Sequence, residues 1–233
     1  MDAQAVERAK RAAGETAAQL VADGMVLGLG TGSTARWFIA AVARLVAGGM
    51  RLSGVPTSRA SEAQAREAGI PVIELPATGV DLAVDGADCV DSDLRVIKGA
   101  GGAMVREKVV AAAARTFVVV VDESKLRAHL AGVLPVEVLP FGWASTLAAI
   151  STACGAPARL RLDPAGAHYV TDNGNLVADA DLAAGITDAQ ALAERLEAIP
   201  GALGHGLFLG MTDVVLAARS DGGVTEIRAG GSA

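Results

Sequence analysis

Two aspartates, a lysine and a glutamate fall within two dozen residues, in the stretch DGADCVDSDLRVIKGAGGAMVREK at 85–108. Asp85 and Asp88 follow an apolar run, and Lys98 opens a glycine-rich turn. Glu107 comes a little way into the helix that we expect to follow. Carboxylates can hold hydroxyl groups or move a proton, and a lysine can neutralise an oxyanion. The stretch therefore predicts a site for a small anionic metabolite.

A second glycine-rich segment, GLGTGSTA at 28–35, follows an apolar run that predicts a strand. Gly30 and Gly32 let backbone amides approach a ligand closely, and the following helix start favours anions. Hydroxyl groups are added by Thr31, Ser33 and Thr34. The segment lacks the third glycine of the dinucleotide fingerprint and the lysine of a Walker loop. It predicts a phosphate cradle, with an ordinary capped turn as the alternative.

Each of these patterns also has a purely structural interpretation. One of the two aspartates could serve as an Asx-turn cap. The KGAGG segment at 98–102 could be a flexible turn with an exposed lysine. Glu107 lies between Arg106 and Lys108, and its local sequence alone favours a solvated helix residue.

A metal site is a weaker interpretation, because two carboxylates are too few ligands. None of the three histidines, His129, His168 and His205, is close in sequence to the aspartates. We therefore expect no metal, and we interpret the histidines as structural.

Composition limits the classes of partner. Hydrophobic residues make up 52% of the 233 residues and charged residues 20%, which is typical of a globular protein. The net charge of −6 disfavours nucleic acid and anionic membrane as partners. The polar N-terminal segment has no signal-like apolar core, and Cys89 and Cys154 match no metal or redox spacing. We expect a cytoplasmic protein with free thiols.

Strands and helices alternate over about the first 130 residues, which predicts an α/β fold with a doubly wound, mostly parallel, Rossmann-like sheet. Segments 70–75 and 117–121 are among the expected strands. From residue 133 the regular strand-helix alternation ends, and Asn173-Gly174-Asn175 is a strong hairpin signal. We predict a small α+β domain at 133–209 and a larger domain formed by 1–132 and 210–233.

Ligands of open α/β sheets bind outside the carboxyl ends of the strands. Four polar residues follow predicted strands and are expected to share one rim: Thr31, Asp85, Lys98 and Lys125. This convergence is the main physical argument for a single site.

The segments GLGTGSTA, DGAD, IKGAGGAMVREK, DESK, PVEVLP and VTDNGN together resemble ribose-5-phosphate isomerase of type A. They cover about residues 10–210 in the order of that family. The resemblance implies an aldose-ketose isomerase that interconverts D-ribose 5-phosphate and D-ribulose 5-phosphate through a cis-enediolate, in the non-oxidative pentose phosphate pathway. It also implies a ferredoxin-like small domain, no cofactor, and a homodimer or homotetramer.

The resemblance makes Glu107 the general base, with Asp85 and Asp88 holding hydroxyls and helping to open the sugar ring. Lys98 would stabilise the developing oxyanion together with backbone amides of 99–101. The implied substrate-binding residues are Lys10, Thr31, Gly32, Ser33, Thr34, Asp85, Gly86, Ala87, Asp88, Lys98, Gly99, Ala100, Gly101 and Lys125.

The chain departs from the family at two positions. Cys89 stands where a glutamate is usual, and Ala100 stands where a glycine is common. Three other functions stay open for a related fold: a non-catalytic sugar-phosphate sensor, an amino-sugar phosphate deaminase and a coenzyme A transferase.

Overall fold

Two compact units make up the chain. The computed structural model describes residues 3–228, so residues 1–2 and 229–233 of the predicted larger domain lie outside the described range. The first unit contains the chain up to 87, then 106–126, and the chain from 210 onward. The second unit contains 88–105 and 127–209.

The predicted boundary at 132/133 differs from this division, because 88–105 and 127–132 also lie in the second unit. The cause is strand pairing. In a small antiparallel sheet, β4 (Cys89–Val90) and β11 (Leu207–Phe208) flank β5 (Val96–Ile97). The sequence pattern predicts a strand near 97, but it does not indicate that its partner lies more than a hundred residues away.

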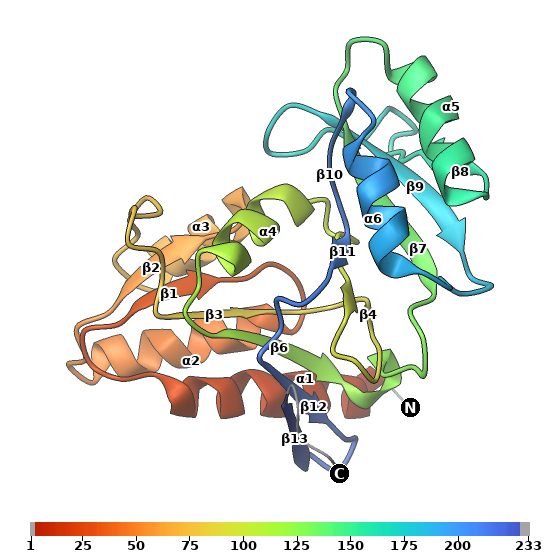
Figure 1. Ribbon diagram of the computed structural model, residues 1–233. Coiled ribbons are helices and arrows are strands. Elements are labelled where there is room, and N and C mark those ends of the chain that lie inside the picture. Colours follow the sequence, from red (N-terminus) through yellow and green to blue (C-terminus); the bar gives the residue numbers. More distant parts are fainter. Residues whose placement is uncertain (1–2, 229–233) are drawn as a thin grey trace. The chain divides into compact units, whose positions relative to one another are not determined.

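The first unit is built on a six-stranded sheet with the order β13-β12-β6-β3-β1-β2 (Figure 1). Its strands are β1 (Val26–Leu29), β2 (Ser53–Pro56), β3 (Leu82–Asp85), β6 (Phe117–Asp122), β12 (Val214–Ala218) and β13 (Val224–Arg228). All neighbours are parallel except β12 and β13. The parallel strands, numbered along the chain, have the spatial order 2-1-3-4-5. This order confirms the predicted doubly wound fold, and it reverses between β1 and β3.

Helices cover both faces of this sheet. On one face lie α1 (Ala3–Ala17) and α2 (Ala35–Ala47), and on the other lies α4 (Met104–Ala112) (Figure 1). Leu27 and Leu29 of β1 join the core under α1 and α2, whereas Gly28 between them faces Val110 of α4. Alternation along the strand thus places its small residue on the face that α4 approaches.

The unit is completed by α3 (Arg59–Glu67) and two short 3-10 helices, η1 (Ala18–Leu20) and η2 (Glu123–Lys125). Ser58 begins α3 with a capping box. The Ser58 side chain accepts the N–H of Ser61, and the Ser61 hydroxyl accepts the N–H of Ser58. The expected strand at 70–75 is absent, and within it only Val72 forms an isolated bridge, to Gly54. Pro71 has no N–H to donate to a ladder, which explains the difference.

The second unit contains a four-stranded sheet with the order β10-β7-β9-β8, antiparallel throughout. Its elements are β7 (Gly132–Val138), α5 (Trp143–Cys154), β8 (Ala158–Leu160), β9 (Leu176–Leu182), α6 (Ala189–Glu197) and β10 (Ala202–His205). A βαββαβ succession with strand order 4-1-3-2 is the ferredoxin-like arrangement, as expected. At the predicted hairpin, the Thr171 N–H donates to the Asn175 carbonyl, and Gly174 takes a φ of +81°.

Both cysteines are free, as expected: Cys89 is buried on β4, and Cys154 is half-buried at the end of α5. Within residues 3–228, every helix is too short or too polar to cross a membrane.

Candidate active site

The ends of β1 and β3 adjoin where the strand order reverses. Asp85 is the last residue of β3 and only 3% exposed. Its Oδ1 accepts the backbone N–H groups of Thr31 at 3.0 Å and Gly86 at 2.7 Å. A Cβ at Gly30 would lie 2.4 Å from Asp85 Cγ. The absence of a side chain at Gly30 therefore makes room for the Asp85 carboxylate.

A cluster of hydroxyl groups fixes the Thr31 side chain. Its Oγ1 donates to Ser58 Oγ at 2.7 Å and lies 2.8 Å from Thr57 Oγ1. Thr57 in turn donates to the Leu29 carbonyl at 3.1 Å. Thr57 and Ser58 are therefore part of the site, although neither was among the predicted site residues. The Thr-Ser pair directly after an apolar strand was the available signal.

The rest of the predicted cradle begins α2. Gly32 has a φ of +108°, a region that favours glycine, and its carbonyl accepts the Arg36 N–H at 3.1 Å. Ser33 is exposed, while Thr34 is buried at the N-cap position. Gly86 and Ala87, which follow Asp85, are half-buried.

Glu107 is buried, with 5% exposure, in the first turn of α4. It lines a small pocket together with Asp85, Thr57 and Gly30. The local expectation of a solvated residue is therefore wrong. Residues three and four positions later on α4 are also buried, so helical periodicity could have revealed the inward face. The helix N-terminus favours the ionised carboxylate electrostatically.

The other two predicted substrate-binding lysines, Lys10 and Lys125, lie on different elements of the first unit. Lys125 is half-buried at the end of η2, directly after β6, the strand next to β3. Asp122 caps η2 by accepting the N–H of Ser124 at 3.1 Å and the hydroxyl of the same residue. Lys10 is half-buried on α1. The pKa of Glu7 is lowered, mainly by its hydrogen bond from Arg36 and in smaller part by the charge of Lys10.

Lys98 belongs to the second unit and follows β5 of the three-stranded sheet. The expectation that Lys98 follows a strand of the parallel sheet is therefore wrong, because β5 belongs to the three-stranded sheet. The residue is 3% exposed, and its Nζ lies 5.6 Å from the centroid of the Phe208 ring. Its backbone N–H donates to the Gly206 carbonyl at 2.9 Å. The ammonium is thus held beside an aromatic face.

The glycine loop that follows Lys98 is tied to Asp88 of the same unit. Asp88 Oδ2 accepts the N–H of Ala100 at 2.9 Å. The loop closes with a hydrogen bond from Gly102 N–H to the Gly99 carbonyl, and both glycines have positive φ. Ala100 does not have a positive φ. The departure from the family at this position therefore introduces no left-handed strain.

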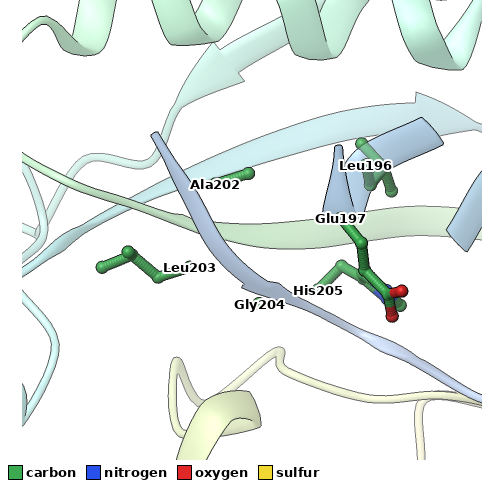
Figure 2. A pocket seen from close by; sticks show the side chains of 6 residues that line it. All are labelled: Leu196, Glu197, Ala202, Leu203, Gly204 and His205. Carbon is green, nitrogen blue, oxygen red and sulfur yellow. The ribbon is translucent and has the colours of Figure 1, made fainter. Parts of the chain in front are cut away.

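A separate pocket in the second unit lies between the end of α6 and β10 (Figure 2). His205 Nδ1 accepts the Leu207 N–H at 3.2 Å, which places the ring proton on Nε2, 3.3 Å from Glu197 Oε1. Both ring nitrogens of His205 thus contact groups of the protein, in keeping with a structural role. The pocket contains none of the predicted site residues. Within residues 3–228, no group of three or more His, Cys, Asp and Glu side chains could hold a metal ion.

The sequence matches the family model for ribose 5-phosphate isomerase A (phosphoriboisomerase A) over residues 53–222. A curated relative, "Ribose-5-phosphate isomerase A" from Haloarcula marismortui, is 47% identical over 216 residues, covering 93% of this chain and 94% of the relative. The same-named protein of Nitrobacter hamburgensis is 46% identical over 220 residues, covering 91% of this chain and 94% of the relative.

Solved structures agree with these sequence relatives. Ribose 5-phosphate isomerase A from Methanocaldococcus jannaschii is 38% identical, with a TM-score of 0.88 over 94% of this chain and 97% of that one. A D-ribose-5-phosphate isomerase in complex with phospho-erythronic acid is 36% identical, with a TM-score of 0.90 over 98% of this chain and 100% of that one.

Proposed function

This chain belongs to the ribose 5-phosphate isomerase A family, and we propose on that basis that it interconverts D-ribose 5-phosphate and D-ribulose 5-phosphate. The protein is thus an aldose-ketose isomerase that acts in the pentose phosphate pathway. The family model and near full-length relatives support the reaction. The buried Glu107 carboxylate, in one pocket with Asp85, is the single observation that supports the mechanism.

The reaction needs a base that serves two neighbouring carbons. In the open-chain aldose, Glu107 removes the proton from C2, and the electron pair moves through the new C1–C2 double bond onto the aldehyde oxygen. The product of this step is a cis-enediolate. Glu107 then returns the proton to C1, and the proton of the C2 hydroxyl passes to O1, so that C2 becomes the ketone and C1 carries a hydroxyl group. A buried carboxylate at a helix N-terminus suits this task, because its position is fixed and few waters compete for it.

The other polar groups have supporting roles in this proposal. Asp85, oriented by two backbone N–H groups, holds a sugar hydroxyl and assists ring opening. Asp88 has the same type of role, and Lys98 with the amides of 99–101 stabilises negative charge on the enediolate.

The phosphate group requires donors and cations, since the chain as a whole is negative. The 31–34 loop offers a glycine turn at the start of α2, and Lys125 supplies a half-buried cation after β6. Lys10 on α1 adds a further positive charge.

The direct test is to incubate the purified protein with ribose 5-phosphate and a chelator, and to follow ketose formation. We expect turnover that the chelator does not reduce. No turnover would refute the isomerase assignment, and restoration of activity only by added metal would refute the cofactor-free mechanism.

The role of Glu107 is tested by Glu107→Gln, which keeps the shape of the side chain and removes its basicity. We expect kcat to fall at least about 100-fold, as is usual when a general base is removed. The control is Glu67→Gln, an exposed glutamate near the end of α3, which should stay within about two-fold of the wild type. Near-normal kcat in folded Glu107→Gln would contradict the assignment.

The other candidate functions give different results in the same preparation. A sugar-phosphate sensor would bind ribose 5-phosphate without turnover. A deaminase would release ammonia from an amino-sugar phosphate, and a coenzyme A transferase would form a thioester on its glutamate. None of these alternatives is favoured by the family relatives.

We also propose that the protein is a homodimer or homotetramer in the cytoplasm. Exposed apolar side chains in the second unit fit such an assembly, among them Phe141 at 88% exposure, with Leu139 and Leu203 also exposed. Light scattering after size-exclusion chromatography would measure the mass directly. A monomer at micromolar concentration would contradict the assembly.

A further inference from the structure

Arg161, which follows β8, uses its guanidinium to hold the glycine loop of the second unit. The side chain is 16% exposed. Its Nε and Nη2 donate to the two carboxylate oxygens of Asp179 at 2.8 and 2.5 Å. Its Nη1 donates to two consecutive carbonyls, those of Gly99 at 3.0 Å and Ala100 at 2.9 Å. One planar fork therefore connects β9 to the loop.

The carbonyl contacts determine where the loop amides point. In a trans peptide the C=O and the N–H of the next residue point in opposite directions. Holding the Gly99 carbonyl on the Arg161 side directs the Ala100 N–H away from it, and this N–H indeed reaches Asp88 Oδ2. By the same geometry, holding the Ala100 carbonyl directs the Gly101 N–H away from Arg161.

Tyr169 completes this support from the same side of the loop. Its hydroxyl donates to the Gly101 carbonyl at 3.1 Å, and Arg161 Cζ lies 5.7 Å from the centroid of its ring. A Cβ at Gly102 would lie 2.5 Å from the Tyr169 ring and hydroxyl, so the loop accepts this tyrosine only because that residue is glycine. Burial raises the pKa of Tyr169, which keeps the hydroxyl protonated and able to donate.

We propose that Arg161 is a positioning residue, which fixes the two peptide planes between Gly99 and Gly101, so that the Ala100 N–H holds Asp88 and the Gly101 N–H can stabilise the enediolate. This inference rests on the proposed function of the loop. Three of the four residues from 99 to 102 are glycines, whose peptide planes rotate at little cost. Fixed donors stabilise developing charge better than donors that must reorient during the reaction. Arg161 supplies that rigidity through two carbonyls, without contact to the sugar.

The test compares Arg161→Met and Arg161→Lys with Arg159→Met, an exposed arginine two residues earlier on β8. Lysine keeps the charge but cannot span Asp179 and two carbonyls at once. Two readouts are measured for each folded variant: kcat and KM with ribose 5-phosphate, and the backbone amide resonances of 99–102 in nitrogen-15 NMR spectra. Thermal unfolding sets a temperature at which every variant is folded.

We expect Arg161→Met to lower kcat about ten- to hundred-fold with KM changed less than about three-fold, and Arg161→Lys to lie in between. The amide resonances of Ala100 and Gly101 should shift in both variants, while Arg159→Met should match the wild type. Unchanged amide resonances, or kcat within about two-fold of the wild type, would overturn the proposal. If Arg161→Met does not fold, Arg161→Lys decides by the same criteria.

The two readouts separate this inference from the proposed function. If the wild type does not isomerise ribose 5-phosphate, the function is refuted, and the amide resonances still report whether Arg161 orients the loop. Shifted resonances with normal kcat would show that the loop orientation does not matter for the reaction, which refutes the positioning role alone.

Discussion

Gly30→Ala should damage the isomerase through Asp85, although alanine adds only one methyl group. The added Cβ would lie 2.4 Å from Asp85 Cγ and Oδ1, and 2.5 Å from the Val84 carbonyl oxygen. These separations are far below van der Waals contact, so the carboxylate or the strand must move. Because Asp85 Oδ1 accepts the N–H groups of Thr31 and Gly86, moving the carboxylate breaks one or both bonds.

The magnitude follows from these contacts. Forcing one extra methyl group into a packed site costs about 1–3 kcal/mol. A hydrogen bond to a charged group contributes about 1.5–3 kcal/mol. Since the clash can be relieved by losing one such bond, we expect the free energy of unfolding to fall by about 1.5–3 kcal/mol. A carboxylate displaced by about 1 Å should also lower kcat/KM by about 10- to 100-fold.

The matched control is Gly14→Ala, on the opposite face of the same sheet. There the Cβ would lie 2.7 Å from the Phe38 backbone nitrogen, where α1 packs closely on α2. This variant also overpacks the first unit. The higher helix propensity of alanine offsets up to about 1 kcal/mol of the resulting loss of stability. It leaves the Asp85 carboxylate in place, so it should lose stability but keep kcat/KM within about two-fold.

Urea unfolding followed by circular dichroism measures stability, and steady-state kinetics measures kcat/KM at a temperature where both variants are folded. Gly30→Ala with wild-type kcat/KM would refute the reasoning, because the carboxylate could then not depend on the missing side chain. An equal loss of activity in Gly14→Ala would also refute it, since the effect would then reflect general destabilisation.

Three further outcomes are expected. Asp85→Asn can keep an acceptor for both backbone N–H groups, whereas Asp85→Ala leaves them unsatisfied, so urea unfolding should show Ala less stable by about 2–4 kcal/mol; equal stabilities would contradict this. Burial raises the folded-state pKa of Tyr169, so its contribution to stability is complete below the ordinary value of about 10 and is lost as pH rises through the folded value. Urea midpoints at pH 9 and 11 should therefore fall more in the wild type than in Tyr169→Phe, and parallel losses would count against this contribution. Lys125→Ala should raise KM for ribose 5-phosphate about ten-fold or more with kcat nearly unchanged, as expected for a lost charged contact to the phosphate; an unaltered KM would exclude that contact.

Much of the parallel sheet could be predicted, because local patterns determine it. The run FVVVVD at 117–122 is buried at every position of β6, as a continuous β-branched segment in a parallel sheet should be. The expected strand at 70–75 failed because Pro71 weakens a ladder that the apolar residues around it would otherwise favour. The apolar residues at 70–75 favour a strand, but Pro71 lacks the backbone N–H that the strand ladder would need.

The division into units could not be predicted from periodicity. Lys98 follows an apolar pair that was correctly expected to be a strand, yet this strand pairs with Leu207–Phe208 and not with the parallel sheet. Strand pairing over such a separation depends on the packing of the whole chain. For the same reason, no local pattern indicates that Arg161 and Tyr169 hold the carbonyls of a loop about sixty residues earlier.

The roles of the carboxylates could not be predicted from their spacing in the sequence. Asp85 and Asp88 are three residues apart, which suggests an acid/base pair, but they belong to different units and each accepts backbone N–H groups of its own unit. Asp85 Oδ1 accepts two such groups, which occupy the lone pairs that a base would use to take a proton from carbon. That geometry favours Asp85 as a holder of sugar hydroxyls. Glu107 is then the better candidate for proton transfer within the pocket that the two residues line, which is why the Gln substitution is the decisive one.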